Sequence, residues 1–196
     1  MFSTKTAVFE SSNKYMPAGI NENVTLKEVN ISKTPNGREF LEIVFENANG
    51  ATASLTEWKN EKNQWIKTDE DLQRRDNLQF GRLLQILKCY SSEIEDADLN
   101  TFSEMINWVK AKLDANIATK TALRLKTTYD NKGFIRVSTY GTFVEPMSVE
   151  EPKVVLTGRD KTTRPSIPVD NEATDPLAPS SIPETTTESQ KDDLPF

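Results

Sequence analysis

The chain has 196 residues, a formal net charge of −6, a single cysteine (Cys89) and no histidine. One cysteine cannot form an internal disulfide, and the lack of histidine excludes most zinc sites, imidazole bases and Ser-His or Cys-His catalytic pairs. The sequence also has no Gly-x-x-x-x-Gly-Lys phosphate loop and no apolar run approaching a membrane span of about 18 residues. We therefore expect a soluble, cytoplasmic protein that uses no cofactor.

The region before residue 60 has the pattern of a three-stranded meander that follows an N-terminal arm (residues 1–21). Apolar residues alternate at Val24 and Leu26 and then, on the opposite parity, at Val29 and Ile31. This change of parity predicts a first strand bent by a β-bulge. The rest of the pattern predicts turns at 35–37 and 49–50 and strands at 39–46 and 51–58.

The period then changes from two to that of a helix. Apolar spacing predicts one helix over about 71–89 and a second marked by residues 102–113, with Asp98 as its N-cap, so that an insertion of helices covers about 69–114. Alternation returns at 121–127 and 135–139, on either side of a turn signal at 130–133.

Three strands, helices and two further strands is the element order of the oligonucleotide-binding (OB) barrel. We predict a mostly-β fold of this kind over residues 1–148: a five-stranded OB-fold barrel with the helices between the third and fourth strands. A small, unrelated mixed sheet with covering helices is the alternative.

Residues 149–196 are rich in Pro, Thr, Ser and Glu and have no periodic apolar pattern, which predicts a disordered acidic tail. Seven acidic residues and Lys191 give residues 170–196 a net charge of −6, so the preceding 169 residues are neutral. The acidic composition belongs to the tail and does not argue against nucleic-acid binding by the body.

The predicted last hairpin is locally basic. Lys120, Arg124 and Lys126 occupy the parity opposite Leu123 and Leu125, so we expect one cationic face. Residues 110–136 hold seven basic and two acidic residues, a net charge of +5. Aromatic rings among such cations suit single-stranded nucleic acid, whose bases stack on the rings while the cations neutralise the phosphates.

An OB groove is framed by the loop between the first two strands and the loop between the last two, and Trp58 ends the third strand. We predict that single-stranded DNA contacts Lys33, Arg38, Trp58, Lys120, Arg124, Lys126, Tyr129, Lys132, Phe134, Arg136 and Tyr140. In the competing interpretation the basic residues form an ordinary solvated face and the rings of Trp58 and Tyr129 belong to the core. Trp108 is expected to pack beside its helix stripe, and Cys89 to be a buried small residue.

Two acidic runs, 69–71 and 93–98, could be imagined as the magnesium site of a nuclease. Both lie at or before a predicted helix start, where carboxylates cap exposed amides and oppose the helix dipole. Because capping accounts for them, we expect no catalytic residue, no metal site and no enzyme.

Five short stretches carry a family resemblance: Gly19 to Val24, Gly37 to Glu42, Thr56 to Trp58, Tyr129 to Phe134 and Tyr140 to Pro146. In these five stretches the predicted domain, residues 1–148, resembles phage-encoded single-stranded-DNA-binding proteins. The chain ends in Asp192, Asp193, Leu194, Pro195 and Phe196, which resembles the tail tip of bacterial single-stranded-DNA-binding proteins. The resemblance implies that other genome-maintenance proteins capture this tip, with the ring in an apolar pocket and the carboxylate on basic groups.

These observations together predict a non-enzymatic protein that coats single-stranded DNA in phage replication, recombination and repair inside the bacterial host cell. Its expected partners are single-stranded DNA and, through residues 192–196, replication and recombination proteins; no membrane is involved, and self-association into a homo-oligomer is left open. The alternatives are an OB-like adaptor that binds only protein and a recombination mediator that anneals strands.

Overall fold

The computed structural model describes residues 15–165. Most of the predicted N-terminal arm and most of the predicted disordered tail, including the tip at 192–196, lie outside the described residues.

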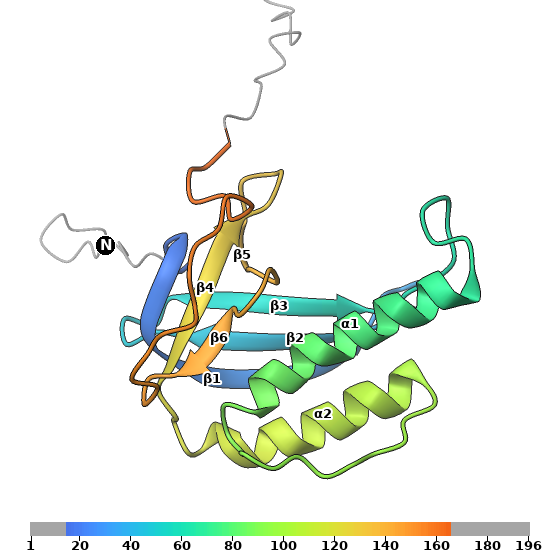
Figure 1. Ribbon diagram of the computed structural model, residues 1–196, viewed down its shortest axis with the longest axis horizontal. Coiled ribbons are helices and arrows are strands. Elements are labelled where there is room, and N and C mark those ends of the chain that lie inside the picture. The colour runs from blue at the N-terminus through green and yellow to red at the C-terminus, as the bar shows by residue number, and fades with distance from the viewer. Residues whose placement is uncertain (1–14, 166–196) are drawn as a thin grey trace, which may run out of the picture. The chain divides into compact units, whose positions relative to one another are not determined.

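The described chain follows the predicted order of strands and helices (Figure 1). The elements are β1 (Gly19–Lys33), β2 (Glu39–Glu46), β3 (Thr52–Trp58), α1 (Asp69–Leu87), α2 (Phe102–Ile117), β4 (Leu123–Tyr129), β5 (Ile135–Val137) and β6 (Val144–Pro146). The short β6 was not predicted, because three residues ending in proline give too little alternation to distinguish a strand from a loop.

Strand β1 is long and bent, and it pairs on both sides. Its C-terminal part, from Thr25 to Lys33, pairs with β2, and its N-terminal part, from Gly19 to Val24, pairs with β4. The register shifts between Leu26 and Glu28, which confirms the predicted bulge. A second irregularity falls before Val24, next to Asn23 with φ of 55°. The two irregularities bend β1, so that one strand serves both halves of the sheet.

The strand order is β3-β2-β1-β4-β5, with every pair antiparallel and β6 paired to β4. The two ends of this path, β3 and β5, contact each other. The result is a nearly closed antiparallel barrel with two helices inserted between its third and fourth strands, as the sequence pattern predicts.

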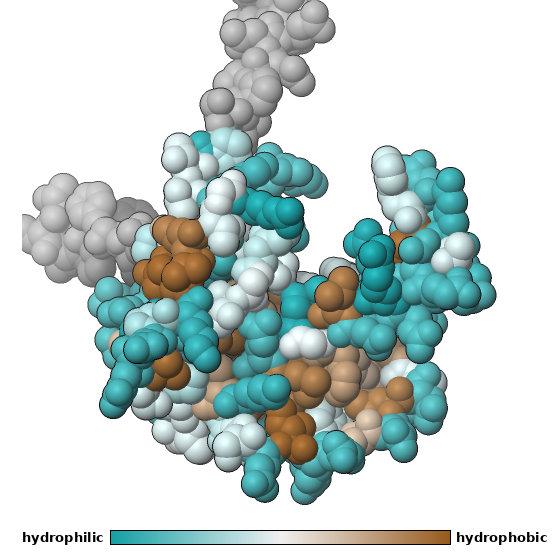
Figure 2. Space-filling model, in the orientation of Figure 1, coloured by the Kyte–Doolittle hydropathy of each residue, from teal (hydrophilic) through white to brown (hydrophobic). Residues whose placement is uncertain are grey.

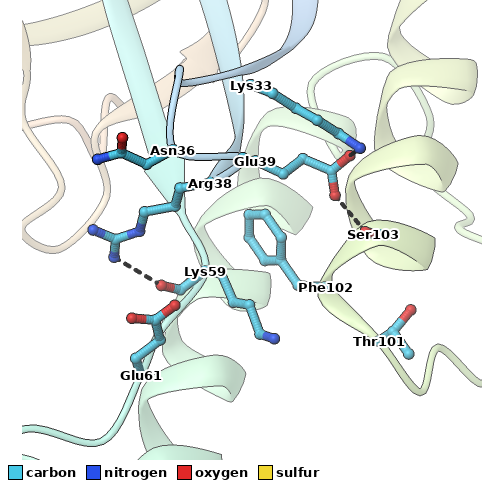
Figure 3. Close-up of a pocket in the computed structure, with 10 residues that line it drawn as sticks. Lys33, Asn36, Arg38, Glu39, Lys59, Glu61, Thr101, Phe102 and Ser103 are labelled. Carbon is cyan, nitrogen blue, oxygen red and sulfur yellow. Dashed lines mark hydrogen bonds and ion pairs between the residues drawn. The ribbon is translucent and has the colours of Figure 1, made fainter.

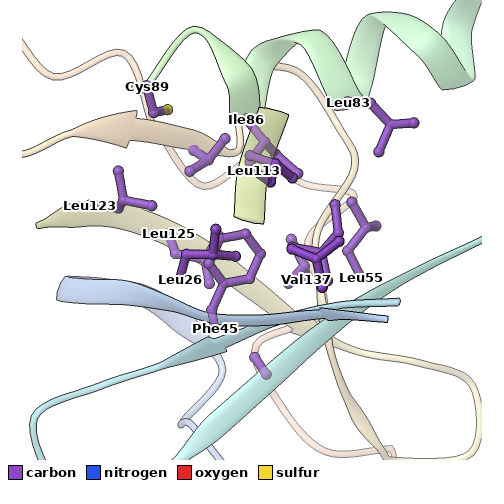
Figure 4. Close-up of a cluster of buried hydrophobic side chains, with 14 of the residues drawn as sticks. Leu26, Phe45, Leu55, Leu83, Ile86, Cys89, Leu113, Leu123, Leu125 and Val137 are labelled. Atoms are coloured by element: carbon purple, nitrogen blue, oxygen red, sulfur yellow. The ribbon is translucent and has the colours of Figure 1, made fainter. Parts of the chain in front are cut away.

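The barrel core is filled by the inward parity of the strands and by the helices (Figure 4). Fully buried side chains include Leu26, Ile43, Phe45, Leu83, Ile86, Ile106, Leu113, Leu123 and Leu125. Helix α2 lies against β1 and β2, and α1 lies against α2 and β6. The predicted packing of Trp108 is confirmed, since its ring lies edge-on to Phe80 with centroids 6.0 Å apart against the core.

The helix starts follow capping rules, with one correction. Thr68 caps α1 and the acidic run 69–71 occupies its first turn, as predicted. The predicted N-cap of α2, Asp98, is wrong. Thr101 occupies that position, and its side chain and that of Glu104 form a reciprocal capping box. The apolar stripe predicts the helix but not which of several capping residues before it is used.

The segment after β6 differs most from the prediction. The domain was expected to end at 148 and the tail to be disordered from 149, but residues 150–165, here called the strap, pack against β4. Val154 is buried, the backbone oxygen of Lys161 accepts a hydrogen bond from Tyr129 N at 2.8 Å, and Asp160 is buried. A polar, proline-containing composition predicts disorder only when its polar groups have no internal partners, and here they have them.

Asp160 fastens the strap. Its carboxylate accepts hydrogen bonds from Lys126 Nζ at 3.0 Å, Ser138 Oγ at 2.5 Å, and Thr157 N and Oγ1 at 2.7 and 2.8 Å. Lys126 also donates to the backbone oxygens of Tyr140 and Val155. The ion pair is fully enclosed, with the two side chains 1% and 0% exposed, so every polar atom in it depends on a partner inside the protein.

We predict that Asp160→Asn lowers the free energy of unfolding by about 3–5 kcal/mol, because it leaves the buried ammonium of Lys126 without its counter-charge. Urea unfolding followed by circular dichroism measures this change. The exposed Asp96→Asn is the matched control and should stay within about 0.5 kcal/mol of the wild type. Equal stability of the two variants would contradict the buried pair.

The same pair predicts a dependence of stability on acid. Burial alone would raise the pKa of Asp160, but hydrogen bonds from Ser138, Thr157 and Lys126 outweigh burial and lower it to about 2 from 3.8. The stabilisation is therefore complete above the unfolded pKa and is lost as the pH falls from about 4 towards 2. The stability difference between wild type and Asp160→Asn should narrow by about 1 kcal/mol at pH 3; a difference that stays constant from neutral pH to pH 3 would contradict the lowered pKa.

Candidate nucleic-acid interface

The structure divides the residues predicted to contact DNA into exposed and buried groups. Exposed are Lys33, Arg38, Trp58, Lys120, Lys132, Phe134, Arg136 and Tyr140; Tyr129 is half-buried; Arg124 and Lys126 are buried. The parity prediction holds, since Leu123, Leu125 and Val137 face the core while Phe134 and Arg136 face outward.

The expectation that Arg124 and Lys126 form an exposed cationic face is wrong. Lys126 is enclosed by the strap and paired with Asp160. Arg124 Nη1 lies 2.7 Å from Glu145 Oε1, and its Nε lies 3.3 Å from Glu22 Oε1. The parity of the strand correctly places both residues opposite the core, but the strap and β6 cover that face.

The Arg124–Glu145 pair affects the pKa of both groups. The hydrogen bond with Glu145 raises the pKa of Arg124. Burial would raise the pKa of Glu145, but hydrogen bonds from Lys153 N, Arg124 and Val154 N outweigh it and lower the pKa. Both groups stay charged and satisfied within the protein, so neither is available to a phosphate.

The exposed aromatic at the end of β3 forms a small platform. Phe40 of β2 and Trp58 of β3 are register partners, with ring centroids 4.4 Å apart and planes tilted by 32°. The guanidinium carbon of Arg38 lies 5.4 Å from the Trp58 ring, and Arg38 Nη2 donates to the backbone oxygen of Lys59 at 3.2 Å. We call Arg38, Phe40 and Trp58 the Trp58 platform. Trp58 remains 36% exposed, so part of its ring is open to a ligand.

A pocket of about 600 Å³ adjoins the Trp58 platform (Figure 3). It collects cations from the β1–β2 turn and the end of β3, namely Lys33, Arg38 and Lys59, but also the carboxylates of Glu39 and Glu61. Glu39 is partly neutralised, since Lys33 Nζ lies 3.7 Å away and Ser103 Oγ of α2 donates to it. The pocket therefore carries a small positive excess, and it shares Arg38 with the Trp58 platform.

The β4–β5 hairpin presents a second group of rings and cations. Asp130 holds its turn, accepting from Lys132 N at 2.8 Å and Phe134 N at 2.9 Å, and pairs with Arg136 at 2.9 Å. The hydrogen bond from Phe134 N is the main cause of the lowered pKa of Asp130. Phe134 is 59% exposed although its backbone is fixed, so its ring is held outward.

The strap adds cations that the prediction missed. Arg159 lies over the Tyr140 ring, with its guanidinium carbon 5.8 Å from the centroid, and Lys161 Nζ donates to Asn131 Oδ1 at 2.7 Å. One sequence signal could have found them. Apart from Lys191, every basic residue after 148 lies within 153–164, ahead of the acidic run.

One face of the molecule is hollowed between two projecting parts of the chain (Figure 2). Figure 2 shows the surface dipping between the raised β4–β5 hairpin and the projecting loop at residues 59–68. β3 contacts β5 and leads into this loop. The loop carries Trp65, 77% exposed next to the buried Ile66. The hollow thus lies between the hairpin that carries Phe134 and Arg136 and the loop that carries Trp65 (Figure 2).

The single cysteine belongs to the hydrophobic core. Cys89 is buried, as predicted, and its thiol donates to Gln85 O at 3.3 Å. Burial, and to a lesser extent the charge of Glu145, raise its pKa to about 12. Within residues 15–165 no cluster of three or more His, Cys, Asp or Glu side chains is arranged to hold a metal ion. Neither helix of this range is long and apolar enough to cross a membrane.

Comparison with known proteins adds no family: no protein-family model matches the chain, and no curated protein is similar enough to count as a relative.

We predict that Cys89 of the native protein reacts with a disulfide reagent such as DTNB at pH 8 at least about a hundredfold more slowly than in urea, because the thiolate is the reactive form and burial disfavours it. Absorbance of the released thiolate gives both rates in one preparation. Equal rates would contradict a buried thiol with a raised pKa.

Proposed function

We propose that this protein binds single-stranded DNA on the face that holds the Trp58 platform, and that its barrel is an OB fold. The fold proposal is supported by the bent β1 shared between β2 and β4, the contact of β3 with β5 and the helices after the third strand. These are features of a five-stranded OB barrel, whose ligands lie across the second and third strands between two loops.

The observation that carries the proposal is the exposed Trp58 ring. It lies on the outer face of β3, backed by Phe40 and beside Arg38, which also lines the pocket that holds Lys33 and Lys59. A tryptophan that is needed only for packing has no reason to remain partly open beside a guanidinium. Stacking of a base on such a ring contributes about 1–3 kcal/mol and tolerates any base, since every base has a π-face.

Preference for single strands follows from the same geometry. In a duplex the flat faces of the bases are covered by their neighbours in the stack, so an exposed ring gains little from contact with it. An unpaired strand offers both its base faces and its phosphates, which Arg38, Lys33 and Lys59 would neutralise with release of counterions. Binding should therefore be sequence-tolerant and salt-dependent.

The biological role proposed from the sequence is that of a phage protein that coats exposed strands during replication, recombination and repair. Residues 192–196, which lie outside the described residues, would recruit partner proteins by their acidic pair and terminal Pro-Phe.

The alternative is an adaptor that binds only protein. The ion pairs of Arg124 with Glu145 and of Lys126 with Asp160 favour the adaptor. These two cations were central to the expected basic face, and within the protein they are unavailable to DNA. The proposal for DNA binding therefore depends on the exposed groups alone, and an experiment on those groups separates the two functions.

We predict that a fluorescently labelled oligothymidine binds the full chain and that a duplex of the same length binds far more weakly. Trp58→Ala should weaken binding about 5- to 100-fold, which is the loss of one stacked base. Arg38→Ala should reduce the slope of log affinity against log salt by about 0.7, one phosphate contact. Fluorescence anisotropy at several salt concentrations measures both quantities.

Arg75→Ala is the matched control. Arg75 is exposed on α1, and its substitution removes the same charge without altering a residue of the Trp58 platform. It should bind like the wild type. If the wild type binds neither DNA, the adaptor becomes the better function.

A further inference from the structure

A second groove, separate from the pocket beside the Trp58 platform, opens where four distant parts of the chain meet. It has a volume of about 890 Å³ and is lined by the start of the described chain, the β2–β3 turn, the β4–β5 hairpin and the strap. Its exposed side chains include Tyr15, Asn49, Phe134 and Arg164. None of the described residues that line it is acidic, in contrast to the pocket at Glu39 and Glu61.

Two aromatic rings in this groove are exposed although their backbones are fixed. Tyr15 is 66% exposed, and it forms a parallel bridge with Thr52 next to the fully buried Met16, whose N donates to Thr52 O at 3.0 Å. Phe134 is 59% exposed and is fixed by its hydrogen bond to Asp130. Such rings offer stacking surface at little entropic cost, because little backbone freedom remains to be lost when a ligand binds.

The strap supplies the cation. Arg164 packs over the hairpin turn, where a side chain on Gly133 would come within 3.1 Å of Arg164 Nε. The strap is held there by Lys161 O, which accepts from Tyr129 N at 2.8 Å and from Thr128 Oγ1 at 3.0 Å. Within residues 15–165 Arg164 has no hydrogen bond or ion pair. A guanidinium without a carboxylate partner is suited to an incoming anion.

We propose that this groove is a second nucleotide-binding site, in which Phe134 and Tyr15 stack on an unpaired base and Arg164 binds the adjacent phosphate. Exposed rings, an unpaired guanidinium and a lining without acidic residues match a nucleotide, which has an aromatic face and a negative charge. An acidic peptide would use the cation but leave the rings largely unused. This inference rests on the proposed function, because it adds a site to the same strand path.

The strap thereby acquires a role in binding. Its buried Asp160–Lys126 pair fixes a segment that also delivers Arg164 to the groove and Arg159 to Tyr140. Trp58 ends β3, whereas the groove includes the turn that precedes β3. A DNA strand long enough to span the length of β3 would contact both the Trp58 platform and this groove, and a short one would occupy only one of them.

The first test is photochemical crosslinking of the full chain to an oligothymidine in which 5-iodouracil replaces thymine, with the crosslinked peptides identified by mass spectrometry. We expect crosslinks in peptides that contain Tyr15 or Phe134 as well as in the peptide that contains Trp58. Crosslinks confined to the Trp58 peptide would overturn this inference and leave the proposed function intact. If the wild type neither binds nor crosslinks, both fail together.

The second test compares variants on two lengths of DNA. Phe134→Ala and Arg164→Ala should each weaken binding of an oligothymidine of about 15 nucleotides by about fivefold or more. An oligothymidine of about 5 nucleotides can occupy only one of the two sites, so one site can still bind it when the other is lost. Trp58→Ala and Arg164→Ala should therefore each weaken binding of the short strand less than they weaken binding of the long one. Arg75→Ala controls for net charge, and circular dichroism verifies the fold of each variant.

If Phe134→Ala and Arg164→Ala both bind the long strand like the wild type while Trp58→Ala does not, the second site does not exist. If these two variants weaken binding of an acidic peptide but not of DNA, the groove is a protein site instead.

Discussion

The bend in β1 is the constraint on which the rest of the molecule depends. A strand of 15 residues that stayed straight could pair with one neighbour on each side of a flat sheet, and its two halves would not face a common core. The bulge after Leu26 and the irregularity before Val24 turn it, so that β2 and β3 follow one half and β4 and β5 follow the other. The bend brings β3 beside β5 and leaves one open region for the helices.

Closure of the barrel determines where exposed residues can gather. Inward positions are used by the core, so Trp58, Phe134 and their neighbouring cations lie on the outside, near strand ends and turns. The helices pack on the core side with apolar stripes such as Leu83, Ile86 and Val109. The surface that carries rings and cations is thus set by the same alternation that builds the core.

The buried Lys126–Asp160 pair shows how a polar segment becomes part of a folded domain. The strap has few apolar anchors, with Val154 buried and Val155 and Leu156 exposed. Its attachment instead uses charge and hydrogen bonds, with Lys126 and Asp160 enclosed and Glu145 accepting from the strap amides of Lys153 and Val154. A network of this kind stabilises only when all of its members are satisfied.

Much of the fold was predictable because it depends on local period. The positions of β2, β3 and both helices, the bulge in β1 and the burial of Leu123, Leu125 and Val137 follow from alternation and helical spacing. What alternation cannot predict is whether a further segment covers the outward face of a strand. Lys126 and Arg124 have the predicted parity and the opposite exposure, because Asp160 and Glu145 come from parts of the chain that carry no periodic signal.

The candidate site was also only partly predictable from the sequence. The exposure of Trp58 and Phe134 followed from their places at a strand end and beside a turn. Phe40 was counted only as part of a buried strand, although it backs Trp58. Arg159 and Arg164 were assigned to the tail, and only the three-dimensional packing of the strap brings them to Tyr140 and Gly133.

The central claim is that one face of the barrel, between the hairpin and the end of β3, holds a single strand of DNA. Hydrogen–deuterium exchange of the full chain with and without oligothymidine tests this most directly, because it reports on every segment of one unmodified protein. The account predicts slower exchange on binding in residues 33–40, 52–59, 129–137 and 159–165, with no change in the outer face of α1. Protection of α1 or α2 without these segments, or no protection at all under conditions where the DNA is bound, would contradict it.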